Sequence, residues 1–80
     1  MTKQEILEIL ARILRDLLGD DSISLTMQTE REEVPNWDSF NFVNFIVAAE
    51  LELGIKFRVA DLESAKNVGD IVALAKAKLD

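Results

Sequence analysis

The chain contains neither cysteine nor histidine among its 80 residues. Without cysteine it forms no disulfide, offers no thiolate to a metal and has no cysteine nucleophile. Histidine is the side chain that most often acts as a general base near neutral pH, so the commonest catalytic base is missing too. Catalysis by the chain alone is therefore not expected, and we predict that the protein is not an enzyme.

Positive charge is also scarce, since nine basic residues face 15 acidic ones and the formal net charge is -6. Binding to DNA or RNA depends on basic side chains that neutralise phosphates, so no nucleic-acid partner is expected. Nearly all of the excess lies in residues 20–38, where Arg31 is the only basic residue. This segment is either a solvated loop or a region that attracts a basic protein surface.

Long apolar runs are absent as well. The longest, Phe45 to Ala49, is far below the roughly 18 residues that span a bilayer, and no basic stretch followed by an apolar one opens the chain. We expect no membrane insertion, no secretion and a cytoplasmic location. Glu30, Glu32 and Glu33 lack the spacing of a calcium-binding loop, so no metal site is predicted.

What is present suits a globular protein, because 49% of the residues are hydrophobic and 30% are charged. The length predicts a single domain over residues 1–80 and, by default, a monomer. A capping-box spacing at Thr2 and Glu5, apolar residues at helical intervals and Gly19 predict a first helix over about residues 2–18. Asp38 as N-cap and Gly54 as terminator predict a second helix over about residues 39–53.

Two further helices are predicted in the second half of the chain. Val59 to Ser64 allows a turn or two, and Asn67 can cap a last helix that ends near Leu79. The fold class is therefore all-α, a small four-helix bundle with three longer helices, one short third helix and a long first loop. The connection over residues 19–37 is either a wrapped loop or contains a short helix that the pattern does not reveal. We favour a loop that wraps around the bundle, with Ile23, Leu25 and Val34 as its anchors.

The second helix is apolar around most of its circumference, and only a narrow stripe of Asn41, Asn44, Ala48 and Glu52 interrupts it. Such a helix is central or offers part of its surface to a partner. At its start, Ser39 places a hydroxyl beside the carboxylate of Asp38. Free N–H groups at a helix N-terminus favour phosphate, so Ser39 is a candidate for carrying a phosphodiester. The alternative is that Asp38 or Ser39 only caps the helix, a role worth about 0.5–2 kcal/mol.

The whole chain resembles the acyl carrier proteins. Asp38-Ser39-Phe40 is similar to the Asp-Ser-Leu motif of that family, and Trp37 precedes it as in many stand-alone carriers. The likeness extends through the long first loop upstream and through two further segments, residues 47–57 and 67–71. The resemblance implies a carrier that holds acyl or aminoacyl thioesters on a 4'-phosphopantetheine arm.

In this family the arm is attached to the motif serine, which implies that Ser39, with Asp38 beside it, is the cofactor site. The implied partners are a phosphopantetheinyl transferase, an acyl-loading ligase, and synthase or transferase enzymes. The acyl chain would be sheltered among Phe45, Ile46, Ala49 and the last helix. The alternative that we retain is a module without a prosthetic group, in which the apolar second helix binds a partner protein.

The chain departs from the family pattern at the second helix. Family members usually carry acidic residues on its exposed stripe, whereas Asn41 and Asn44 stand at the matching positions here. This difference reflects either neutral drift of a solvated face or a changed choice of partners. The second interpretation favours a dedicated biosynthetic pathway over general fatty acid synthesis. Phe40 replaces the usual leucine, and we interpret it as a bulkier core residue. The predicted partner-binding residues are Asp38, Asn41, Val43, Asn44 and Val47.

Overall fold

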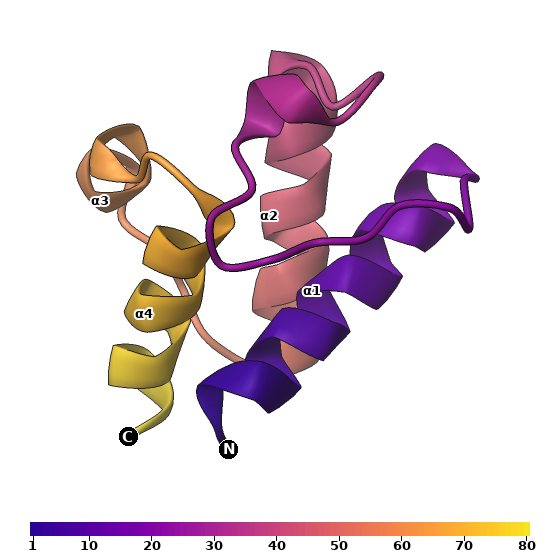
Figure 1. Ribbon diagram of the computed structural model, residues 1–80. Coiled ribbons are helices and arrows are strands. Elements are labelled where there is room, and N and C mark those ends of the chain that lie inside the picture. The colour runs from indigo at the N-terminus through magenta and orange to yellow at the C-terminus, as the bar shows by residue number, and fades with distance from the viewer.

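The computed structural model describes residues 1–80, and helices are its only regular secondary structure. Its elements in chain order are α1 (Lys3–Leu18), the single 3-10 turn η1 (Arg31–Glu33), α2 (Ser39–Leu53), α3 (Val59–Ser64) and α4 (Val68–Leu79). The predicted all-α bundle with a short third helix is confirmed. None of the helices combines the length and the hydrophobicity needed to cross a bilayer. Both termini lie at one end of the bundle, away from the start of α2 (Figure 1).

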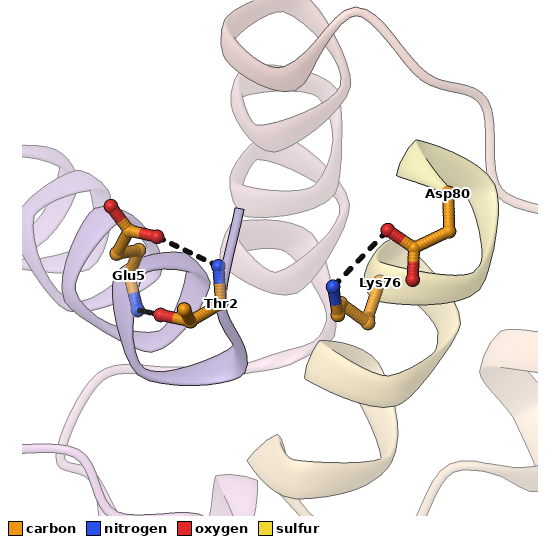
Figure 2. A network of polar contacts seen from close by, with 4 residues as sticks. All are labelled: Thr2, Glu5, Lys76 and Asp80. Carbon is orange, nitrogen blue, oxygen red and sulfur yellow. Dashed lines mark hydrogen bonds and ion pairs between the residues drawn. The ribbon is translucent and has the colours of Figure 1, made fainter.

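Local signals in the sequence set the helix ends. At the start of α1 the Thr2 hydroxyl accepts from the Glu5 N–H at 3.1 Å, and the Glu5 carboxylate accepts from the Thr2 N–H at 2.7 Å. Figure 2 shows this reciprocal pair opposite the end of α4, where Lys76 contacts Asp80 at 3.1 Å. Gly19 and Gly54 adopt left-handed conformations, with φ of 64° and 67°, and end α1 and α2. Glycine adopts this conformation without steric cost, which explains why both helices stop there.

The core forms where α1 packs against both α2 and α4. The side chains that are almost completely buried there are Ile6, Leu10, Leu14, Phe45, Val68 and Val72. Burying such side chains contributes about 1.5–3 kcal/mol each relative to exposure, so the three long helices supply most of the stability. Helix α3 contributes no buried residue and lies beside the start of α4 (Figure 1).

The first loop wraps around the bundle as predicted, and its anchors Ile23, Leu25 and Val34 are buried. Backbone hydrogen bonds attach it to α4: the Val68 N–H donates to the Thr29 carbonyl at 2.8 Å, and the Gly69 N–H donates to the Met27 carbonyl at 2.7 Å. A Cβ at residue 69 would lie 2.6 Å from that Met27 oxygen, so only glycine fits. The turn η1 was not predicted, because three polar residues carry no helical period.

Candidate functional site

Ser39 is the first residue of α2 and is exposed. Asp38 performs the capping, since its carboxylate accepts from the Asn41 N–H at 2.8 Å and its carbonyl accepts from the Phe42 N–H at 2.8 Å. The Ser39 hydroxyl makes no hydrogen bond within the chain. Of the two capping roles that the sequence left open, Asp38 therefore takes the structural one, and the Ser39 hydroxyl is free to react.

The backbone before Ser39 is held in place from two sides. Asn36 has a φ of 69°, and its carbonyl accepts from the Asn41 side-chain amide at 2.9 Å. Trp37 is buried, with its ring centroid 5.1 Å from that of Phe45 and 6.0 Å from that of Phe42. A left-handed asparagine and a buried indole together fix the path of the chain into α2, so Ser39 stands on a rigid support.

A groove of about 550 Å³ runs between α2 and α3. Its apolar lining consists of Phe42, Val43, Ile46, Val47, Phe57, Val59, Leu62 and Ala65. Charged side chains complete its lining, among them Arg31, Glu32 and Lys66. A mainly apolar groove is the usual form of a site for an organic ligand.

Helical spacing places Ser39 at one end of this groove. The α2 residues that line it lie three, four, seven, eight and eleven positions after Ser39, which is the repeat of one helix face. A group attached to the Ser39 hydroxyl can therefore run along α2 over Val43 and enter the groove beside Ile46.

The predicted shelter for the acyl chain coincides with this groove only in part. Phe45 and Ala49 are completely buried against the core, and α4 contributes no lining residue. Of the three α2 residues named for this role, only Ile46 lines the groove. The side chains of the groove wall opposite α2, Phe57 and Leu62 among them, were not predicted, because nothing in their spacing links them to Ser39. The helical repeat counted from Ser39 would have identified the α2 wall.

The outer face of α2 is apolar. Its exposed fractions are 73% for Phe40, 60% for Val43, 48% for Val47 and 80% for Leu51. The interpretation of Phe40 as a core residue is therefore wrong: at one position after Ser39, it lies on the side of α2 that faces solvent. The helix is apolar on both sides, so its pattern alone did not indicate which side faces inward.

The predicted partner-binding residues divide into two groups. Asp38, Val43 and Val47 are exposed, whereas Asn41 and Asn44 are half-buried. Asn41 is also engaged by the hydrogen bond to the Asn36 carbonyl. The stripe that the sequence marked as polar therefore lies beside the exposed face of α2 rather than at its centre.

Comparison with protein-family models gives no match. Among curated proteins, the acyl carrier protein of Thermotoga maritima is 32% identical over 78 residues, covering 98% of this chain and 96% of that protein. The meromycolate extension acyl carrier protein of Mycolicibacterium smegmatis is 31% identical over 90% of this chain and 73% of its own. The solution structure of holo acyl carrier protein from Geobacter metallireducens superimposes with a TM-score of 0.86 at 40% identity, covering 92% of this chain and 85% of that one.

These relatives match the chain over nearly its full length, and their fold is the one described above. Proteins of this kind carry acyl groups between biosynthetic enzymes and are not themselves catalysts. The free serine hydroxyl, the groove that α2 and α3 form beyond it and the relatives at about 30% identity agree: the chain belongs to the acyl carrier protein family.

Proposed function

We propose that Ser39 carries a 4'-phosphopantetheine arm and that the protein holds acyl or aminoacyl thioesters on it. The observation that carries this proposal is the exposed, unbonded hydroxyl of Ser39 at the start of α2, in line with the groove. The N–H groups in the first turn of a helix have no partner within the helix, so a phosphate on Ser39 lies next to unpaired donors. The residues present therefore fit the phosphate of the arm.

The attachment needs a separate phosphopantetheinyl transferase. The Ser39 oxygen attacks the phosphorus of coenzyme A that bears pantetheine, a new P–O bond forms, and adenosine 3',5'-bisphosphate leaves. The serine proton goes to a base on the transferase, because the chain has no histidine or cysteine to accept it. Coenzyme A and such a transferase meet in the cytoplasm, which is where we place the protein.

The attached arm supplies a thiol that binds the cargo as a thioester. Because the chain has no cysteine, this thiol has no competitor within the protein, and loading is confined to one position. We propose that the cargo lies in the groove against Val43, Ile46 and Leu62, where apolar surface excludes water from the thioester.

The test is intact mass before and after incubation with coenzyme A and a broad-specificity transferase. We expect the native chain to gain one phosphopantetheine and Ser39→Ala to gain none. Ser24→Ala is the matched control, because Ser24 is also exposed and lies in the first loop, away from any helix start. It should be modified like the native chain. Modification of Ser39→Ala, or its absence from the folded native chain with several transferases, contradicts the proposal.

We also propose a dedicated pathway with its own loading ligase and synthase or transferase rather than general fatty acid synthesis. The support is the outer face of α2, which presents apolar side chains where a carrier with many basic partners would present carboxylates. Transfer assays that compare a general fatty acid synthase with candidate ligases, each at physiological salt, would check this proposal. Efficient loading by the general enzymes alone would contradict it.

A further inference from the structure

A second, smaller cavity adjoins the groove between α2 and α3. Its volume is about 40 Å³, and it shares with the groove the walls that Arg31, Phe42, Ala65 and Lys66 form. Its remaining walls come from Trp37 and from the start of α4. Space for a water molecule begins at about 10–15 Å³, so this cavity admits a group of a few atoms but no long chain. The end of a chain that lies in the groove can enter it.

Three side chains of this small cavity are hydrogen-bond donors. Arg31 and Lys66 are cations, and neither takes part in an ion pair within the chain. Trp37 is 3% exposed, and its indole Nε1 is the one buried side-chain nitrogen or oxygen of the chain without a hydrogen-bond partner. Buried N–H groups without an acceptor are rare in folded proteins, because losing the bond to water is not compensated. The donor set is therefore suited to an acceptor oxygen.

The acceptors close to the small cavity are engaged elsewhere. Asn67 is the one lining side chain with an acceptor atom, and its Oδ1 accepts from the Asp70 N–H at 2.9 Å. The Asp70 carboxylate accepts from the Lys66 N–H at 2.7 Å and lines a separate depression between α3 and α4. Its charge offsets part of the charge of Lys66, so Arg31 and Trp37 are the stronger donors.

The charge of the lining changes between the groove and the small cavity. The carboxylates of Glu32, Glu50 and Glu63 line the groove, and none of them lines the small cavity. The guanidinium of Arg31 lies 5.6 Å from the centroid of the Phe42 ring, at the wall that the two spaces share. A negative group is therefore disfavoured along the groove and favoured where it reaches the small cavity.

We propose that the small cavity binds the terminal carboxylate of a linear dicarboxylic acyl chain, whose other end forms the thioester. This proposal rests on the carrier function of Ser39 and names the class of its cargo. The methylene groups of such a chain lie against the apolar wall of the groove. Its carboxylate accepts from Trp37 Nε1 and pairs with Arg31 and Lys66. A plain alkyl chain brings no acceptor to Nε1, and a water molecule brings no charge to the two cations.

The test compares matched cargoes on the full chain. A broad-specificity transferase attaches acyl-phosphopantetheine directly from acyl-coenzyme A. Hexanoyl, octanoyl and decanoyl chains can thus be compared with adipoyl, suberoyl and sebacoyl chains, which have the same lengths and end in a carboxylate, and with ω-hydroxyacyl chains of those lengths. Intact mass shows that each sample is fully loaded. The chain has a single tryptophan, so its ¹H–¹⁵N spectrum contains one indole signal, which reports on Trp37 Nε1.

We expect at least one carboxylate chain to move the indole ¹H signal downfield and to slow its exchange with solvent, as a hydrogen bond to a carboxylate does. The alkyl chains should leave the signal near its position in the unacylated phosphopantetheine form. If no carboxylate chain moves it further than the alkyl chain of the same length, the proposal is wrong. An ω-hydroxyacyl chain that moves it as far as the carboxylate chain of that length also overturns the proposal, as does contact of the indole N–H with water in every sample.

A second measurement tests the cations. The rate at which hydroxylamine cleaves the thioester reports how firmly the cargo is held in the groove. Arg31→Gln should reduce the protection of the best carboxylate chain about 5-fold and leave that of the matched alkyl chain unchanged. Lys66→Gln should act in the same direction but less strongly. The matched control, Arg58→Gln, removes a cation that lines neither space and should change neither cargo. Equal protection of the carboxylate chain in the native chain and in Arg31→Gln contradicts the proposal.

The carrier proposal and the cargo proposal fail separately in these experiments. If the folded native chain gains no mass from any acyl-coenzyme A with several transferases, the carrier proposal is refuted. If it is fully loaded but the carboxylate and alkyl chains give the same indole signal, the cargo proposal alone is refuted.

Discussion

Helices α1 and α2 are similar in length, yet the side chains that they expose to solvent differ in polarity. α1 buries Leu10 and Leu14 and turns charged residues outward, so that Leu17 is its only large apolar side chain exposed, at 36%. α2 buries Phe45 as completely but exposes a second apolar face that ends at Leu51. The core explains the inner faces of both helices. It does not explain the outer face of α2, which adds nothing to the packing of the core.

The two helices also begin differently. α1 opens with a reciprocal pair of hydrogen bonds and an acidic residue in its first turn, whereas α2 has Asp38 alone and no acidic residue in its first turn. An acidic side chain favours a helix N-terminus, because the free N–H groups carry partial positive charge. In α2 the N-cap carboxylate of Asp38 binds one of these N–H groups, that of Asn41, and no acidic residue of the first turn binds another. The phosphate that we propose on Ser39 would lie beside the remaining ones.

The largest effects should come from the inner faces, where the two helices are alike. Phe45→Ala removes a completely buried ring and should lower the free energy of unfolding by about 3–5 kcal/mol, and Leu14→Ala in α1 should lower it by about 2–5 kcal/mol. Urea denaturation followed by circular dichroism measures both. A loss below about 1 kcal/mol for Phe45→Ala would mean that α2 is not central to the core.

Next in size are the two caps. Thr2→Ala and Asp38→Ala each remove a side-chain acceptor from a helix start and should each cost about 1 kcal/mol. Asp38→Asn keeps an acceptor oxygen and should cost less. Thermal unfolding of the three variants measures this. If Asp38→Ala leaves the free energy of unfolding unchanged, Asp38 does not cap α2. The argument that Asp38 caps the helix and so leaves the Ser39 hydroxyl free would then fail.

The outer face of α2 should respond least in stability. Leu51→Asn should change the free energy of unfolding by no more than about 0.5 kcal/mol, since Leu51 is 80% exposed in the folded chain. The same urea titration serves as the measurement, with Leu17→Asn as its counterpart on α1. A loss of about 2 kcal/mol or more, on the order of a buried leucine, would show that Leu51 is covered by other parts of the chain.

The smallest predicted effect is a titration at the start of α1. Hydrogen bonds from the Thr2 backbone and hydroxyl lower the pKa of Glu5 below its ordinary value near 4.5. A carboxyl group with a lowered pKa stabilises the fold at pH values above that ordinary value, and this contribution is lost as the pH falls through the lowered pKa. In Thr2→Ala the pKa of Glu5 should move up only in part, because the backbone N–H of residue 2, whose hydrogen bond is the larger cause, is kept. The pKa of Asp20, lowered by hydrogen bonds from Ser22, should not change. Carboxyl ¹³C NMR titration checks both.

The helix ends could be predicted because they depend on neighbouring residues. A capping box at Thr2, glycines at residues 19 and 54 and N-caps at Asp38 and Asn67 act within one turn, so the sequence contains the whole signal. The buried anchors of the first loop could also be predicted, because isolated aliphatic residues in a polar segment are usually buried against the core.

The orientation of α2 could not be predicted, and neither could the groove. A helix that is apolar on nearly all sides has no clear hydrophobic direction, so Phe40 was assigned to the core, although the structure exposes it. For the same reason Phe45 and Ala49 were assigned to the cargo, although neither lines the groove. The outer wall of the groove comes from α3, whose position depends on tertiary contacts. Whether Ser39 bears the arm and whether Val43 and Val47 meet partner enzymes stay predictions.

The attachment of the first loop to α4 has a consequence for how this chain tolerates substitution. Its two hydrogen bonds use the carbonyls of Met27 and Thr29, which every amino acid possesses, so these two positions can vary without losing the link. The restriction falls instead on Gly69, on a helix that begins some forty residues later. Among descendants of this chain, residues 27 and 29 should vary while residue 69 stays glycine. The invariant residue of this contact therefore lies in α4 and not in the loop.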